Sequence, residues 1–317
     1  MENNIQLSVV MSVFNGEKYI AEAIDSVLNQ DFIDFEFIIV NDGSTDGSLR
    51  IIQSYSDKRI VLVNKTNGGL SKALNTGIRI ARSNLIARMD ADDICLPGRF
   101  RRQIDFMKKH PDCVVLGTNA CYISEAGEDL FVPSVLLNDE EIKRYLPNSA
   151  FFHSSVVFRK DKFELAGGYP EQIPHFVEDK VLWNKMAKLG LFFNLGSPLI
   201  KYRIVPNSIT ASKFASDRLE RVFWNLVNDN PVSQDDIDHV LQLKSKKIPN
   251  SLLWSNYFFR LGKIYLEYNF NRRLALKYLF KSVVLNKINA KIYFNLFLVF
   301  MPRAFVVWWK KSRGIVV

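Results

Sequence analysis

The segment that decides the fold is Leu85-Ile-Ala-Arg-Met-Asp-Ala-Asp-Asp93, in which a short apolar run ends in a cluster of acids. A run of this length bounded by turn residues is typical of a buried strand. Three similar runs precede it, and we expect strands at Leu7 to Val13, Glu36 to Val40 and Arg59 to Val63. Apolar residues at helical spacing separate these runs. The alternation indicates consecutive βαβ units, so we expect an α/β fold with a mostly parallel sheet and helices on both faces.

Polar residues follow each of the four expected strands. They are Asn15-Gly16, Asp42-Gly43-Ser44, Asn67-Gly68-Gly69 and Asp90-Ala-Asp-Asp93. The carboxyl ends of parallel strands meet at one edge of the sheet, where ligands bind in folds of this kind. We therefore expect the functional site at this edge.

The acids after the fourth strand form a candidate metal site. Asp90 and Asp92 lie on one side of a short extended segment. An isolated pair with this spacing is more often a plain turn. Because this pair belongs to an ordered set of strand ends, we expect it to share a divalent cation with a diphosphate. Mg²⁺ or Mn²⁺ suits such hard oxygen ligands.

The segment after the second strand combines a helix start with a candidate ligand. We expect Ser44 or Thr45 to cap a helix over Ser48 to Tyr55. The Asp42 carboxylate would then be free to accept a hydrogen bond from the imide N–H of uracil or thymine. Acids at the end of the second strand often contact nucleosides in doubly wound sheets.

The segment after the third strand precedes another helix. Its backbone N–H groups, from Asn67 to Gly69, could serve a plain turn or could face phosphate oxygens at the helix N-terminus. Lys72 lies one turn further and would add a positive charge.

Glu178 and Asp179 come near the start of a helix expected from Val177 to Leu189. Acids in a first turn stabilise a helix by about 1 kcal/mol or less, which would explain them without any function. The functional alternative is a general base, since a hydroxyl nucleophile near neutral pH needs a carboxylate within hydrogen-bond reach. His153 is explained more simply as a hydrogen-bonded structural histidine than as a ligand.

Several other enzyme classes lack their sequence signatures here. The chain has no HExxH, no GxSxG elbow with Ser-His-Asp ordering, no Walker loop and no GxGxxG after the first strand. Proteolysis, ester hydrolysis, ATP hydrolysis and dinucleotide chemistry therefore lose support. The three cysteines have no disulfide or zinc spacing, which favours a reducing cytosol.

Taken together, these segments resemble the inverting nucleotide-sugar glycosyltransferases of family 2, which have the GT-A fold. The resemblance covers about residues 5 to 210 and rests on motifs in a fixed order. The matching stretches are Leu7-Ser-Val-Val-Met-Ser-Val-Phe-Asn-Gly16, Phe35-Glu-Phe-Ile-Ile-Val-Asn-Asp-Gly-Ser-Thr-Asp-Gly47, Asn67-Gly-Gly-Leu-Ser71 with Asn75-Thr-Gly77, Met89-Asp-Ala-Asp-Asp-Ile94 with Pro97 and Arg99, and Phe176-Val-Glu-Asp179.

The resemblance implies a role for each candidate residue. Asp179 would be the catalytic base, and Asp90 and Asp92 would hold the metal. Val205 stands where relatives often carry a histidine, so a third protein ligand is not expected. The nucleotide-sugar donor would contact Ser12, Phe14, Asn15, Asp42, Lys72 and Asp90. The acceptor side would include Glu178, Gly168 in Gly167-Gly168-Tyr169, and His153.

The composition of the chain changes near residue 212. We expect a GT-A catalytic domain over residues 1–212 and a basic, aromatic-rich helical region over 213–317. From Lys244 onward the chain has fifteen Lys and Arg against one acid, a charge of +14. Since the whole chain carries +9, the first 243 residues carry −5. The two parts are therefore expected to face different partners.

The most apolar stretch of the basic region runs from Ile292 to Trp309, but Asn295, Pro302 and Arg303 interrupt it. We expect an interfacial helix pair on an anionic membrane. Trp308 and Trp309 would lie at headgroup depth, and the cations on the lipid would be Lys310, Lys311 and Arg313. The alternative is a helical hairpin that packs on the catalytic domain. No nucleic-acid module is recognisable, so nucleic acid is not an expected partner.

These observations favour a cytoplasmic, peripheral enzyme on the inner face of the cell membrane. By resemblance, it would move a sugar from a UDP- or dTDP-sugar to a hydroxyl of a lipid-linked saccharide, with inversion, in the synthesis of a bacterial capsule, O-antigen or exopolysaccharide. A processive synthase would need several membrane spans and a QxxRW motif, which the chain lacks. The rival from another class is a membrane scaffold that binds a nucleotide sugar without turning it over.

Overall fold

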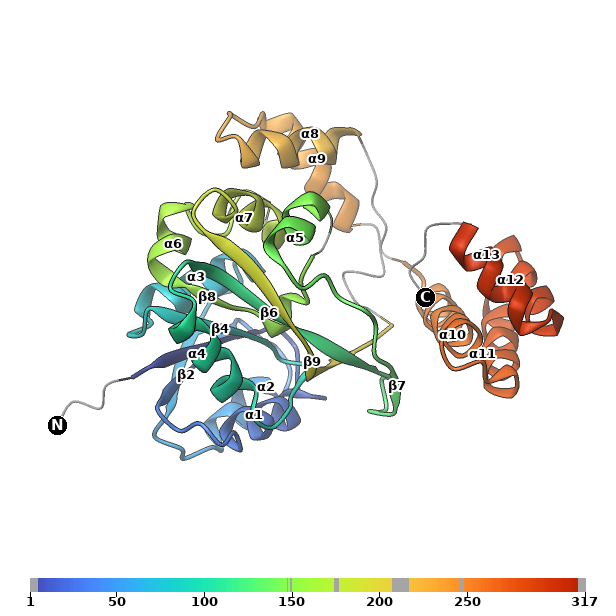
Figure 1. The fold of residues 1–317 in the computed structure, drawn as a ribbon, viewed down its shortest axis with the longest axis horizontal. Helices are drawn as coiled ribbons and strands as arrows, with labels where there is room; N and C mark the ends of the chain where they lie inside the picture. Colours follow the sequence, from blue (N-terminus) through green and yellow to red (C-terminus); the bar gives the residue numbers. More distant parts are fainter. Residues whose placement is uncertain are drawn as a thin grey trace. The chain divides into compact units, whose positions relative to one another are not determined.

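The computed structural model describes residues 5–146, 148, 150–173, 177–206, 217–245 and 248–312 (Figure 1). Three sequence predictions fall outside this description. They concern Phe176 of the last family motif, the domain boundary near residue 212, and Arg313 in the basic tail.

Nine strands of the described chain form one sheet. They are β1 (Leu7–Val13), β2 (Phe35–Asp42), β3 (Ile60–Lys65), β4 (Leu85–Asp90), β5 (Ile94–Cys95), β6 (Cys113–Ile123), β7 (Asp129–Phe131), β8 (Val157–Arg159) and β9 (Leu191–Arg203). Their order is β3-β2-β1-β4-β8-β6-β9-β5, and β7 pairs with β6. β1 to β4 are parallel to one another, whereas β8 joins β4 in the antiparallel sense. The four predicted strands are confirmed.

The helices occupy the connections between these strands and the C-terminal part of the chain. They are α1 (Ile20–Leu28), α2 (Ser48–Gln53), α3 (Leu70–Ile80), α4 (Arg99–Lys109), α5 (Asp139–Tyr145), α6 (Lys160–Leu165), α7 (Glu178–Met186), α8 (Asp217–Val227), α9 (Gln234–Ser245), α10 (Asn250–Glu267), α11 (Arg272–Leu285), α12 (Ala290–Phe300) and α13 (Arg303–Ser312), with a short 3₁₀ helix, η1 (His153–Ser155).

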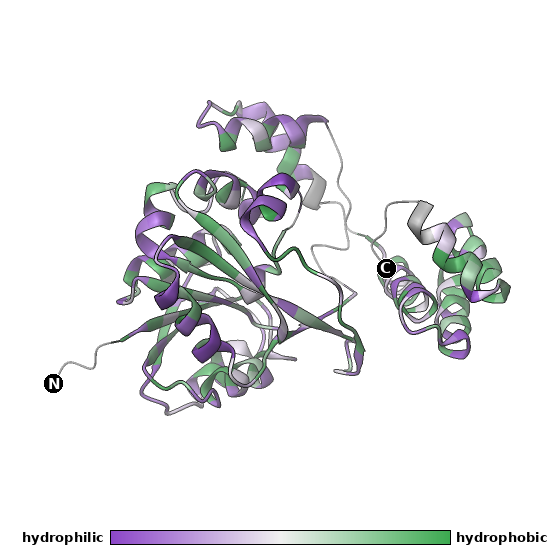
Figure 2. Cartoon of the chain, viewed as in Figure 1, coloured by the Kyte–Doolittle hydropathy of each residue, from purple (hydrophilic) through white to green (hydrophobic). Residues whose placement is uncertain are grey.

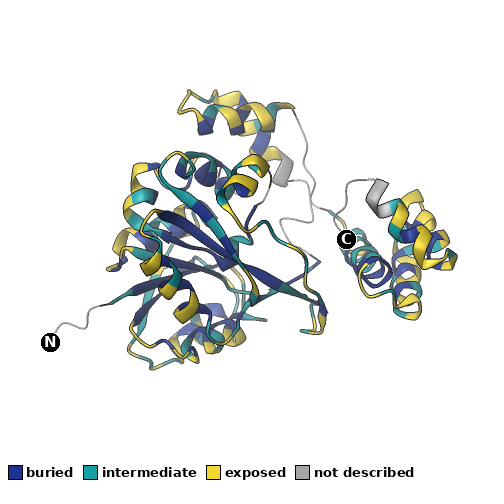
Figure 3. Cartoon of the chain, viewed as in Figure 1, coloured by how far each residue is buried: buried dark blue, intermediate teal, exposed yellow. Residues whose placement is uncertain are grey.

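Side chains from alternate positions of the strands enter two cores, one on each face of the sheet. In β1, Val9 and Met11 belong to the core that α1, α2 and α4 cover, whereas Val10 belongs to the core under α3, α6 and α7. This alternation follows from the two-residue repeat of a strand. Figure 3 shows the strands mostly buried and the outer helix faces exposed. Helices on both faces are therefore confirmed.

The register of the parallel strands brings their carboxyl ends to one edge. Ser12 of β1 lies opposite Val40 of β2 and opposite Asp90 of β4. Asp42, the last residue of β2, lies opposite Lys65 of β3. Two of the predicted site acids are thus the last residues of their strands, and their loops leave the sheet together.

The chain forms two compact units that are interleaved in sequence. The first contains Met1–Ala120, Val135–Tyr202 and Phe214–Leu243, and the second contains Cys121–Ser134, Arg203–Lys213 and Lys244–Val317. α8 and α9 therefore belong to the first unit, although their composition placed them in the predicted helical region. The physical reason is a small apolar core in which Leu219 and Val222 of α8 pack with Val177 and Val181 at α7.

The second unit is built on a close pair of helices. Gly262 of α10 lies against Leu279 of α11, where an added Cβ would come within 2.7 Å of the Leu279 Cγ. The buried hydroxyls of Ser255 and Ser282 lie 3.0 Å apart across the same contact. α12 and α13 follow, separated at Met301 and Pro302, so the predicted break in the apolar stretch is confirmed. Among the described residues, no helix combines the length and apolar content needed to cross a bilayer.

Candidate active site at the carboxyl edge of the sheet

The loops after β1 and β2 are held together by hydrogen bonds. The Asn15 N–H donates to Ser44 Oγ at 3.0 Å, and Asn15 Oδ1 accepts from the Thr45 N–H at 2.8 Å. Asn15 has a positive φ of 54°, a conformation that asparagine tolerates well. The predicted cap on α2 is therefore wrong: Ser44 and Thr45 join the two loops, and Asp46 Oδ1 accepts from the Ser48 N–H at 3.0 Å instead.

The Asp42 carboxylate is buried and already bound by its own protein. It accepts hydrogen bonds from Lys65 Nζ at 2.6 Å, from the Gly68 N–H at 2.9 Å and from the Gly69 N–H at 2.8 Å. The carboxylate is therefore not free, because the loop after β3 folds back onto it, and its contact with a nucleobase stays a prediction. Asp42 therefore holds the Asn67-to-Gly69 turn in place, and the Gly68 and Gly69 N–H groups donate to Asp42 instead of to a ligand.

The remaining predicted donor residues lie around these loops. Ser12 is partly buried at the end of β1, and Phe14 is 54% exposed in the following loop. Lys72 is exposed on the first turn of α3, and its Cβ lies beside Gly68. An exposed aromatic ring next to a strand end is a surface on which a planar base can stack.

Three carboxylates gather after β4. One oxygen from each of Asp90, Asp92 and Asp93 lies within 4.8 Å of the others. Sequence reasoning found Asp90 and Asp92 but missed Asp93, which is buried. An all-carboxylate set fits a hard divalent cation such as Mg²⁺ or Mn²⁺.

Arg88 is a second residue of the candidate site that the sequence analysis missed. It points from β4 on the same face as Asp90, two residues away, and its buried guanidinium forms an ion pair with that carboxylate. Burial alone would lower the pKa of Arg88, but the Asp90 carboxylate raises it above its ordinary value. The available signal was a single charged residue within an otherwise apolar strand.

Glu178 and Asp179 form the second acidic group, at the first turn of α7. Burial, and then the charge of Asp179, raise the pKa of Glu178 to about 8. Burial also raises the pKa of Asp179, against the hydrogen bond from the Lys180 N–H and the charges of Lys180 and Arg88. Glu178 Oε2 is buried and has no hydrogen-bond partner in the part of the chain that the structure describes.

His153 lies between these acids and the Gly167-Gly168-Tyr169 turn. Its Nε2 is 2.7 Å from the hydroxyl of Tyr169, a ring that is almost fully buried. Burial, helped by the charge of Arg88, lowers the pKa of His153 well below its ordinary value, so the imidazole is neutral. This hydrogen bond fits the structural role expected of His153, and its place on the acceptor side stays a prediction. Gly168 has a φ of 71°, which favours glycine at this turn.

Electrostatic interactions with Arg88 connect the two acidic groups. Arg88 acts on Asp90, on Tyr169 and His153, and on both Glu178 and Asp179. Direct contacts join the same elements. The Asp90 N–H donates to Ser154 Oγ of η1 at 3.1 Å, His153 of η1 bonds to the Tyr169 hydroxyl, and the His153 ring lies 6.0 Å from the Trp183 ring of α7. The residues of β4, η1, the glycine turn and α7 therefore form one site.

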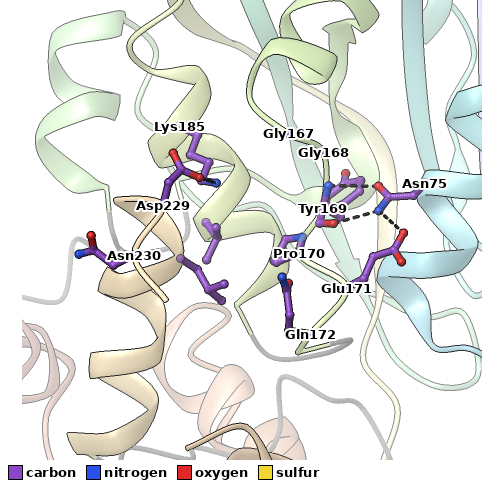
Figure 4. A pocket seen from close by; sticks show the side chains of 12 residues that line it. Asn75, Gly167, Gly168, Tyr169, Pro170, Glu171, Gln172, Lys185, Asp229 and Asn230 are labelled. Atoms are coloured by element: carbon purple, nitrogen blue, oxygen red, sulfur yellow. Dashed lines mark hydrogen bonds and ion pairs between the residues drawn. The ribbon is translucent and has the colours of Figure 1, made fainter. Parts of the chain in front are cut away.

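A pocket of about 500 Å³ lies beside this site in the first unit (Figure 4). Asn75 of α3 fixes the backbone of Tyr169 at this pocket. Its side-chain Nδ2 donates to the Tyr169 carbonyl, and its Oδ1 accepts from the Tyr169 N–H. Its walls are Gly167, Gly168, Pro170, Glu171, Gln172, Val181, Lys185, Leu226, Asp229 and Asn230.

A mostly parallel sheet with carboxylates and a base candidate at its carboxyl edge has the architecture of a nucleotide-dependent transferase. The profile of the family described as Glycosyl transferase family 2 matches residues 8–176, and the chain belongs to that family of glycosyltransferases.

Curated relatives agree with the family. The chain is 31% identical over 288 residues to an uncharacterized glycosyltransferase of Haemophilus influenzae, covering 81% of this chain and 87% of the relative. It is 35% identical to the amylovoran biosynthesis glycosyltransferase AmsE of Erwinia amylovora, covering 62% and 75%. It is 34% identical to the O-antigen biosynthesis glycosyltransferase WbnJ of Escherichia coli, covering 66% and 84%.

Solved structures show the same fold. TarS 1-349 of S. aureus in complex with UDP-GlcNAc superposes with a TM-score of 0.58 at 19% identity, covering 98% of this chain and 92% of TarS 1-349. The same protein in complex with UDP gives 0.56 at 18% identity, covering 88% of each chain. The predicted GT-A fold is thereby confirmed.

Proposed function

We propose that this glycosyltransferase moves a sugar from a UDP- or dTDP-sugar to a hydroxyl of a lipid-linked saccharide, with inversion, in the synthesis of a bacterial surface polysaccharide. The names of AmsE and WbnJ support the pathway class, and the nucleotides bound to TarS support a uridine donor. The observation that carries the mechanism is the joint placement of the Asp90 cluster and Asp179 around Arg88.

Asp179 is the proposed base. Its carboxylate would take the proton of the acceptor hydroxyl while the hydroxyl oxygen bonds to the anomeric carbon and the bond to the diphosphate oxygen breaks. Burial raises the pKa of Asp179, which strengthens its carboxylate as a proton acceptor, while the Lys180 N–H and the charges of Lys180 and Arg88 oppose that rise. A single displacement of this kind inverts the anomeric centre.

Asp90, Asp92 and Asp93 are the proposed holders of Mg²⁺ or Mn²⁺. Three carboxylate oxygens within 4.8 Å of one another fit such an ion, although Asp90 shares one oxygen with Arg88. When bound, the cation would neutralise charge on the departing nucleoside diphosphate. Arg88 orients Asp90 for that role, and Asn15 with Phe14 would flank the nucleoside.

Helices α10 to α13 of the second unit are proposed to bind the cytoplasmic surface of an anionic membrane. The one acid after Lys244 is Glu267, which is buried and lies 3.6 Å from Lys263. The exposed charges of these helices are therefore cations. They are Arg272, Arg273, Lys277, Lys281, Lys287, Lys291 and Arg303.

Large apolar side chains are exposed among these cations. On α12 they recur as Tyr293, Phe294, Phe297 and Phe300, which is one face of a helix. On α11 they are Phe280 and Val284, and on α13 they are Phe305 and Trp308. Figure 2 shows that much of the α12 ribbon has hydrophobic residues. Aromatic residues surrounded by cations suit a surface of anionic lipid headgroups over acyl chains.

A nucleotide-sugar-binding scaffold without turnover is the less favoured function. Burying Glu178 and partly burying Asp179 raises their pKa values, which costs free energy in the folded state. A binding scaffold gains nothing from that arrangement, whereas a base does.

Hydrolysis of α-linked UDP- and dTDP-sugars without acceptor tests the proposal, followed by ¹H NMR before the released sugar equilibrates. The expected result is slow release of the β-anomer, since water replaces the acceptor. Release of the α-anomer would contradict inversion. No release from any donor, with nucleotide still bound, would favour the scaffold.

A further inference from the structure

We propose that the pocket beside α7 binds the terminal sugar of the acceptor, and that α8 with its following turn selects that sugar. The inference rests on the proposed function, because it concerns the substrate whose hydroxyl Asp179 would deprotonate. The pocket measures about 500 Å³, within the range of roughly 300–1,000 Å³ that ligand sites occupy.

The pocket begins next to the proposed base. Val181 and Lys185 line it from α7, and they lie on the same helix face as Glu178 at successive turns. One turn of helix is about 5.4 Å long. A sugar seated against Val181 would therefore have its hydroxyls within reach of the first turn of α7.

The turn from Gly167 to Gln172 serves both the site and the pocket. The Tyr169 ring is buried with its hydroxyl on His153, whereas its backbone is clamped by Asn75 at the pocket. Glu171 accepts from the Asn75 amide at 2.9 Å with one carboxylate oxygen. Figure 4 shows these groups on one side of the pocket and Lys185 with Asp229 on the other.

The chemistry of the walls fits an uncharged saccharide. The charged groups are two carboxylates, Glu171 and Asp229, against one cation, Lys185, which is 2.5 Å from Asp229. This balance disfavours a phosphate group. Carboxylates and the amides of Gln172 and Asn230 match hydroxyls that both donate and accept. Apolar contact surface for sugar C–H groups comes from Pro170, Val181 and Leu226.

The selecting wall lies outside the family match. The match ends at residue 176, whereas Lys185, Leu226, Asp229 and Asn230 follow it. The proposed base Asp179 also follows the match, so the match does not divide the base from the wall. Relatives that perform one reaction on different acceptors are expected to differ in the groups around the acceptor.

The test is ligand-observed NMR with p-nitrophenyl glycosides of the common hexoses and N-acetylhexosamines, using the full chain. Asn230→Trp would fill the pocket from an exposed position, and Asn228→Trp, two residues away but outside the pocket, is the matched control. We expect at least one glycoside to bind, with affinity reduced at least tenfold by Asn230→Trp and unchanged by Asn228→Trp. In transfer to that glycoside, Asn230→Trp should raise the acceptor KM and leave the donor KM unchanged.

Binding of UDP, measured on the same samples by thermal shift, separates this inference from the proposed function. If UDP binds and no glycoside does, or if Asn230→Trp leaves glycoside affinity unchanged, the acceptor pocket is wrong while the donor site stands. If UDP itself fails to bind, the proposed function fails first. A glycoside that competes with UDP would also overturn the inference, because it would occupy the donor site.

Discussion

The two compact units hold their charges in opposite ways. In the first, Arg88 is buried against Asp90, and Glu178 and Asp179 sit at a buried helix start with raised pKa values. In helices α10 to α13 of the second unit, the single acid, Glu267, is buried, while cations and aromatic rings face outward. Charges held inside a rigid site suit bond making, whereas exposed cations among apolar side chains suit adsorption to a surface. We therefore propose that chemistry and location are assigned to separate units.

The largest expected effect is in the first unit. Asp179→Asn keeps the shape of the side chain but cannot take a proton, so we expect kcat to fall by roughly 10²–10⁴-fold. UDP affinity should stay within about twofold of wild type. Asp105→Asn, an exposed acid on α4, is the control and should keep its turnover. Near-normal turnover of Asp179→Asn would remove Asp179 as the base.

The second unit gives the next effect. Phe297→Glu with Phe300→Glu places acids on the α12 face, so binding to vesicles of phosphatidylcholine with phosphatidylglycerol should weaken at least tenfold, since each buried Phe contributes about 1.5–3 kcal/mol. Donor hydrolysis in solution should not change. Leu165→Glu on α6 is a matched control, because Leu165 is 70% exposed and Phe300 is 69% exposed. The measurement is co-sedimentation of wild type, the double variant and Leu165→Glu with these vesicles. Equal co-sedimentation of all three, or binding that does not depend on anionic lipid, would contradict a membrane-binding role for the second unit.

A pH-dependent stability difference sharpens the account of the α7 acids. The pKa of Glu178 is raised to about 8, above its ordinary value of about 4.3. Between these pH values the folded chain binds more protons than the unfolded chain, so this group lowers stability as pH rises. Glu178→Gln should therefore gain about 1–2 kcal/mol over wild type at pH 8.5, roughly 2–8 °C in Tm, and little at pH 5. An equal Tm difference at both pH values would show that Glu178 is not protonated in the folded chain.

The smallest effect concerns the loops that carry the donor residues. Ser44→Ala removes the acceptor of the Asn15 N–H and should lower the free energy of unfolding by about 0.5–1.5 kcal/mol. Ser54→Ala is the control, because that exposed hydroxyl bonds only to Ile51 in its own helix. Chemical denaturation of both variants measures the difference. A loss no greater than the control's would mean that the two loops are not joined in solution.

The sequence was sufficient for the sheet and for the edge where the site lies. Strands β1 to β4 were predictable because their apolar runs end in polar residues, and parallel strands bring such ends together. The hydrogen bonds that occupy Asp42 were not predictable. Their three donors lie at residues 65 to 69, at and after the end of the neighbouring strand β3.

Two other features depended on packing rather than pattern. Arg88 was not singled out in the sequence, and its burial with an ion pair to Asp90 is seen only in the structure. α8 looked like part of the basic region, since composition does not reveal that Leu219 and Val222 pack against α7. Long-range contacts of this kind override local composition.

The most direct test of the central claim is a thermal-shift measurement of UDP and dTDP binding with and without Mn²⁺, since a ligand of the folded state raises Tm. Wild type should show a shift that needs Mn²⁺, Asp92→Ala should lose it, and Asp105→Ala, which removes the same charge from an exposed site on α4, should keep it. A shift that survives in Asp92→Ala, or no shift with either nucleotide, would contradict a metal-assisted donor site at the carboxyl edge of the sheet.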